Sequence, residues 1–87
     1  MSRGRVHIVN VSIPGLPLAV AASLMQGGGL AAAMLDVGTS PLDVIIEFGD
    51  GSRYLYPDVP APLALAVKQD PESGFQNIKF WPGYHKI

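Results

Sequence analysis

The chain has 87 residues and a formal net charge of -1, from six Lys and Arg against seven Asp and Glu. This near-neutral charge excludes a protein that holds many phosphates by bulk electrostatics, and the absence of cysteine excludes disulfides and thiolate metal sites. Charged residues make up 15% of the chain, below the ~25% typical of soluble domains. We therefore expect one small domain over residues 1–87, with a thin core and a tendency to form homo-oligomers, in a cytoplasmic setting.

The N-terminal third is the most apolar part of the chain. Arg3 and Arg5 precede an apolar stretch in the manner of a secretory signal, and residues 8–35 contain no charged side chain. Prolines, Asn10 and three successive glycines at 27–29 interrupt this stretch. We expect neither a signal peptide nor a membrane span.

The first elements follow from composition and periodicity. Residues 5–13 are rich in β-branched side chains and predict a strand in which His7, Val9, Val11 and Ile13 share one face. Residues 16–26 are rich in alanine and leucine and predict a short helix that the glycines end. Residues 30–35 are compatible with a helix or a strand.

The clearest pattern is a β-hairpin. Two strand-like runs, 42–48 and 53–56, flank the turn sequence Gly-Asp-Gly-Ser. Alternation places Tyr54 and Tyr56 on one face of the second strand, and we expect both rings to face outward. Prolines then open a helix over about 61–69, which residues 70–74 end. The sequence thus predicts an α+β fold: a small antiparallel sheet that contains the 42–56 hairpin, one helix packed on it, and the N-terminal strand and short helix added.

An ordered set of short motifs spans the last 50 or so residues. It consists of Phe48-Gly49-Asp50-Gly51, Tyr54-Leu55-Tyr56, Val59-Pro60, Ser73-Gly74-Phe75, Asn77-Ile78 and Trp81-Pro82 with Tyr84. This set resembles the KTSC domain, a module named for its occurrence at the C-terminus of some lysyl-tRNA synthetases and also found alone in small bacterial and phage proteins. The resemblance covers about residues 35–87, leaves 1–34 as an N-terminal extension, and implies a role in RNA binding.

Aromatic and basic residues near the hairpin and tail form the candidate ligand site. Aromatic rings stack on nucleobases and nearby cations attract phosphates. The candidate residues are Tyr54, Tyr56, Trp81, Tyr84, Arg53, Lys79 and Lys86, with Arg5 as an arm that reaches from a neighbouring subunit. The alternative is that the rings close a small core, as buried aromatic residues usually do.

Other chemistries have weaker support. His7 and His85 have no second histidine or cysteine at metal-ligand spacing, so we expect no metal and no cofactor. The glycines at 27–29 lack the Gly-Lys-Ser/Thr ending of a phosphate-binding loop. The acidic residues near the hairpin are typical of a solvated strand face. We predict a protein that is not an enzyme.

The sequence leaves two functions open. The first is a non-catalytic binding module for RNA or a nucleotide-type ligand, which in a phage protein would sequester a nucleotide signal in the host cytoplasm. The second is a structural or protein-interaction component of a phage or bacterial assembly.

Overall fold

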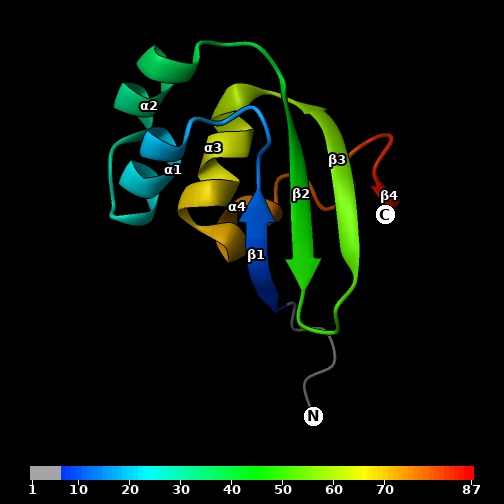
Figure 1. The fold of residues 1–87 in the computed structure, drawn as a ribbon. Helices are drawn as coiled ribbons and strands as arrows, with labels where there is room; N and C mark the ends of the chain where they lie inside the picture. Colours follow the sequence, from blue (N-terminus) through cyan, green and yellow to red (C-terminus); the bar gives the residue numbers. More distant parts are fainter. Residues whose placement is uncertain (1–6) are drawn as a thin grey trace.

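Helices pack on one face of a four-stranded antiparallel sheet in the part of the chain that the computed structural model describes, residues 7–87 (Figure 1). The elements in chain order are β1 (Ile8–Ser12), α1 (Leu18–Met25), α2 (Leu30–Val37), β2 (Leu42–Phe48), β3 (Arg53–Val59), α3 (Ala61–Gln69), α4 (Pro71–Phe75) and β4 (His85–Lys86). The strands lie in the order β1-β2-β3-β4, so β1 and β4 are the two edges. The predicted α+β fold, with its hairpin and the helix over 61–69, is confirmed.

The β2–β3 hairpin is held by its turn as well as by its ladder. Gly51 adopts a φ of 91°, which favours glycine, and its N–H donates to the Phe48 carbonyl at 2.9 Å. The Asp50 carboxylate accepts hydrogen bonds from the backbone N–H and the hydroxyl of Ser52, at 2.9 and 2.6 Å. These bonds lower the pKa of Asp50, since they favour its ionised form.

A β-bulge in β1 overturns part of the expected face pattern. Ile8 pairs with Phe48 and Asn10 with Glu47, so Val9 is an extra residue in the ladder. The bulge turns Val9 toward solvent, where it is 51% exposed, while Val11 remains buried. The prediction that Val9 and Val11 share a face was therefore wrong, because strict alternation does not hold across a bulge.

A second bulge, near the end of β3, redirects this strand toward α3. Leu42 pairs with Val59 and Val44 with Tyr56, so β3 holds one more residue than β2 over this interval. Asp58 adopts a φ of 52°, and its N–H donates to the Asp43 carboxylate at 3.1 Å. Tyr56 and Val59 are both buried as a result, although their spacing of three would place them on opposite faces of a regular strand.

Two C-terminal elements were not expected. Residues 71–75 form the short helix α4 rather than a loop, because Pro71 ends α3 but occupies the first turn of the next helix, where its missing N–H costs nothing. The tail also adds the two-residue strand β4 to the edge of β3. The ambiguous segment after the glycines is helical, as α2.

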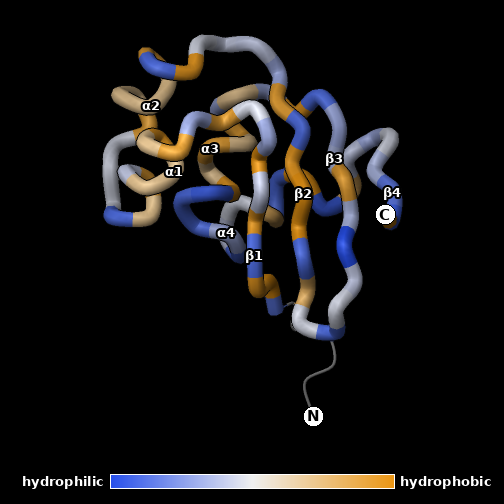
Figure 2. Tube along the Cα trace, viewed as in Figure 1, coloured by the Kyte–Doolittle hydropathy of each residue, from blue (hydrophilic) through white to orange (hydrophobic). Residues whose placement is uncertain are grey.

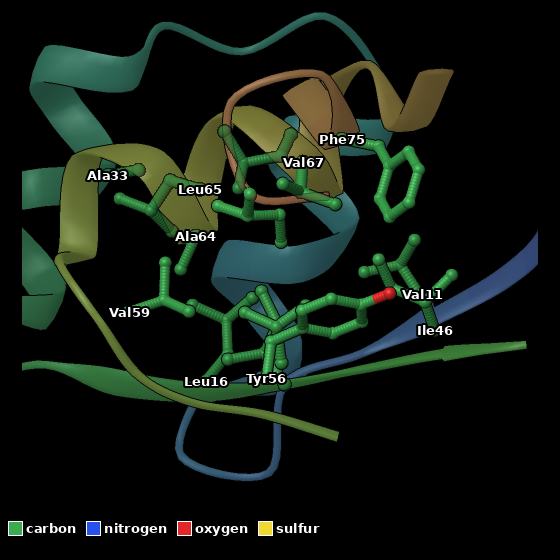
Figure 3. Packing of buried hydrophobic residues seen from close by; sticks show 14 of the residues in the cluster. Val11, Leu16, Ala33, Ile46, Tyr56, Val59, Ala64, Leu65, Val67 and Phe75 are labelled. Atoms are coloured by element: carbon green, nitrogen blue, oxygen red, sulfur yellow. The ribbon is translucent and has the colours of Figure 1, made fainter. Parts of the chain in front are cut away.

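The core lies between the inner sheet face and the helices. Figure 3 shows Val11, Ile46 and Tyr56 from the sheet among Leu65, Val67 and Phe75 from α3 and α4. α1 and α2 both pack against α3, and β1 pairs with β2, so residues 8–34 share this sheet and core with the rest of the chain. Within residues 7–87, no helix is long and apolar enough to cross a membrane.

Candidate aromatic and basic binding site

Three tyrosine rings gather on the helix-covered side of β3. The Tyr84 ring lies parallel to that of Tyr56, with an interplanar angle of 6° and 5.5 Å between centroids, and 6.1 Å from that of Tyr54. Phe48 meets Tyr54 edge-on at 5.8 Å, and Phe75 meets Tyr56 edge-on at 6.0 Å. Aromatic pairs favour such edge-on and offset-parallel arrangements at 4.5–7 Å, so these five rings form one packed cluster.

Tyr56 lies at the buried end of this cluster. It is 2% exposed and belongs to the core. Burial raises its pKa to about 12, with smaller contributions from Tyr84 and Tyr54. The expectation that both phenol rings face outward was therefore wrong for Tyr56, because β3 turns its tyrosine face toward the helices. Tyr54 is partly buried on the same face.

Trp81 anchors the tail to the end of β3. Its indole Nε1 donates to the Pro57 carbonyl at 2.8 Å, and its ring is partly buried against the core. The indole ring therefore packs against the core, so core packing, the alternative to ligand stacking, describes this ring. Two tail rings retain a free surface: Tyr84 is 44% exposed and Phe80 is 82% exposed.

The candidate cations divide between the two sides of the sheet. Lys86 pairs with Tyr54 across the β3–β4 ladder, so it lies on the side of the tyrosine cluster. Arg53 directly precedes Tyr54 in β3, and because successive side chains of a strand point to opposite faces, it lies on the opposite face. Lys79 places its ammonium group 5.4 Å from the Phe80 ring centroid. Arg5 lies outside the described residues.

The site that remains is an exposed tyrosine and one cation on the same side of the sheet. We call Tyr84, Tyr54 and Lys86 the Tyr84 surface. The parallel ring of Tyr56 supports Tyr84 from the core side and leaves its exposed area for a ligand. Such a surface can stack a planar group and pair with an anion, and it contains no nucleophile with a neighbouring base. Within residues 7–87, no three or more His, Asp or Glu side chains gather as metal ligands would.

A groove along the free edge of β1 was missed by the sequence reasoning. It consists of two cavities of about 300 and about 130 Å³ that share Asn10, Val11 and Lys68 in their linings. Among residues 7–87, Lys68 is the only ionisable side chain in either lining, and its Nζ donates to the Val11 carbonyl at 2.6 Å. The one signal in the sequence was a single lysine in the otherwise uncharged helix segment 61–69.

Searches of protein-family models, of curated proteins and of solved structures find no match to this chain. The resemblance to the KTSC domain therefore stays a prediction.

Proposed function

We propose that the protein is a non-catalytic cytoplasmic module that binds single-stranded RNA or a nucleotide-type ligand at the Tyr84 surface. The observation that carries the proposal is the support of the half-exposed Tyr84 ring by the buried, parallel Tyr56 ring. A ring held in this way is already ordered before a base stacks on it, which lowers the entropic cost of binding.

The neighbours of Tyr84 fit the same ligand class. Base stacking on aromatic side chains contributes about 1–3 kcal/mol per base and tolerates every base. Lys86 stands on the same side of the sheet, two residues further along the chain, and can pair with a phosphate. With one aromatic surface and one adjacent cation, we expect weak binding that depends little on sequence and falls as salt rises.

The test is a titration of the full chain with a single-stranded oligouridylate, with AMP and with a cyclic dinucleotide at low salt. Tyr84→Ala removes the stacking ring, and we expect it to weaken binding about tenfold, as loss of one stacked base predicts. Tyr84→Phe keeps the ring and should bind as the unsubstituted protein does. Lys86→Gln should weaken binding and reduce its salt dependence.

Lys68→Gln is the matched control, because it removes a cation from the β1 groove rather than from the Tyr84 surface. Circular dichroism of each variant establishes that the fold survives. The proposal fails if none of the three probes binds at millimolar concentration, or if Tyr84→Ala binds as well as Tyr84→Phe.

We also propose that the protein forms a homo-oligomer through the outer surface of α2. This surface presents Leu35, which is 88% exposed, beside the exposed Ala31 and Ala32. Isolated exposed apolar residues are ordinary, but here they lie in a stretch of chain, residues 8–35, that carries no charge, and the exposed Asp36 is the one charged side chain of α2.

A further inference from the structure

β1 is an edge strand with backbone groups that face away from β2. The Phe48 N–H donates to the Ser52 carbonyl within the hairpin, so by alternation Ile46 also turns its backbone groups toward β3. Val11, the partner of Ile46, therefore turns its own groups away from β2, and its carbonyl accepts a hydrogen bond from Lys68 of α3. In an antiparallel ladder the N–H and C=O of one residue point to the same side, so the Val11 N–H also points to the free edge. The Ile13 carbonyl turns back to accept the Leu16 N–H at 2.9 Å, and the free edge ends there. Figure 1 shows β1 at the border of the sheet, beside α3.

The cavities on either side of Lys68 are apolar apart from this lysine and the strand itself. The larger cavity continues along Leu16, Leu18 and Ala21, and the smaller one along Ile8, Met25 and Pro71. Side chains of α1 and α3 line both cavities, so both lie between the edge of β1 and the helices, where every second side chain of an added strand would point. The groove therefore offers backbone partners in the middle, one cation beneath them and an apolar hollow at each end.

We propose that this groove binds an extended peptide segment that adds to the edge of β1 and presents an acidic side chain to Lys68. The peptide residue opposite Val11 exchanges backbone hydrogen bonds with Val11. The side-chain carboxylate of this peptide residue then replaces the Val11 carbonyl as the hydrogen-bond acceptor of the Lys68 ammonium group. Residues two positions before and after it point into the two hollows. The recognised pattern is apolar-x-Asp/Glu-x-apolar, in the manner of strand addition.

Charge selects this occupant over a second copy of the chain. Two-fold pairing of β1 with another β1 would bring two Lys68 ammonium groups together, and none of the described residues that line the cavities carries a carboxylate to offset them. Val11 is only 4% exposed, so the Lys68 side chain must leave the Val11 carbonyl before a strand can pair there, and a carboxylate on the incoming strand is the group that draws it away. A partner strand with a carboxylate neutralises the charge of Lys68, whereas an uncharged strand would bury the Lys68 ammonium group with no anion beside it.

The test uses heptapeptides with acetylated and amidated ends, of the form Thr-apolar-Thr-Glu-Thr-apolar-Thr, with Val, Ile, Leu or Phe at the apolar positions. Binding to the full chain is followed by the backbone amide resonances of residues 8–13. At least one peptide should shift the Val11 amide resonance in a saturable way. Replacing the peptide's Glu by Gln, or Lys68→Gln in the protein, should weaken binding about tenfold, as expected for loss of a charge-assisted hydrogen bond.

Controls that change the peptide and leave the protein unsubstituted do not depend on protein stability. Methylation of the Glu backbone nitrogen removes the donor to the Val11 carbonyl and should abolish binding, although the carboxylate remains. Lys86→Gln, on the far edge of the sheet, should leave peptide binding unchanged. The proposal is overturned if no peptide shifts these resonances at millimolar concentration, if the Glu and Gln peptides bind equally, or if β1 of the peptide-free protein is already paired with a second copy.

Discussion

The phenol of Tyr56 sits among apolar side chains, and this placement determines which charge state the folded protein tolerates. Phe75 meets its ring edge-on and Tyr84 lies parallel to it. A phenolate at this position would lose hydration without gaining a cation, so burial raises the pKa of Tyr56 to about 12. The same ring supports the exposed Tyr84, so one residue serves both the core and the candidate site.

The raised pKa predicts a loss of stability at alkaline pH. In the unfolded chain Tyr56 ionises near the ordinary value of 10, whereas in the folded chain it stays neutral until about pH 12. Its contribution to the free energy of unfolding is therefore complete below pH 10 and is lost as pH rises to 12, a loss on the order of 2 kcal/mol. Urea denaturation at pH 9 to 12 should show a steeper decline for the unsubstituted protein than for Tyr56→Phe. If the free energy of unfolding falls equally in both proteins over this pH range, ionisation of Tyr56 is not the cause.

At the scale of elements, the contact between α3 and α4 depends on a residue without a side chain. A Cβ atom at Gly74 would lie 2.6 Å from both the Cα and the backbone nitrogen of Val67. Backbone atoms of a helix cannot move aside as the end of a flexible side chain can. The close approach lets α4 bury Phe75 against the sheet, and so it supports the aromatic cluster.

Gly74→Ala should therefore separate α4 from α3. Alanine favours a helix over glycine by up to about 1 kcal/mol, but overpacking costs about 1–3 kcal/mol, and we expect the steric cost to prevail because the clash is with backbone. Urea denaturation should show a lower free energy of unfolding. Ser73→Ala, at the exposed neighbouring position, should change it by less than about 0.5 kcal/mol. Equal stability of the two variants would refute the predicted clash.

At the scale of the whole molecule, charge is unevenly distributed. β1, α1 and most of α2 contain no charged side chain, and Figure 2 shows α1 and α2 mostly in the colours of apolar residues. The charged residues begin with Asp36, near the end of α2, and continue through the hairpin, the segment that holds α3 and α4, and the tail. Residues 8–35 are thus uncharged, whereas the Tyr84 surface belongs to the charged part of the chain.

This distribution predicts association through α2. Native mass spectrometry and light scattering of the purified chain should give a mass above that of the 87-residue monomer. Leu35→Glu places a charge at the centre of the α2 surface and should produce a monomer of unchanged thermal stability, since Leu35 is 88% exposed. Leu35→Ala should weaken association only in part. A protein that is already monomeric, or a Leu35→Glu variant that still associates, would exclude this interface.

The sequence by itself determined the features that arise between near neighbours in the chain. Alternation and the Gly-Asp-Gly-Ser turn sufficed for the hairpin, and prolines in the first turn sufficed for the start of α3, because these preferences act over a few residues. The same local rule correctly placed Tyr54 and Tyr56 on one face.

Only the tertiary structure decided which face of the sheet is inside. Alternation relates two side chains to each other but not to the helices, so it did not show that Tyr56 is buried while Tyr84 remains exposed. The β1 groove depends on a bond between Lys68 and Val11, which are 57 positions apart. Contacts of this kind come from packing between distant segments, and no local pattern in the chain encodes them.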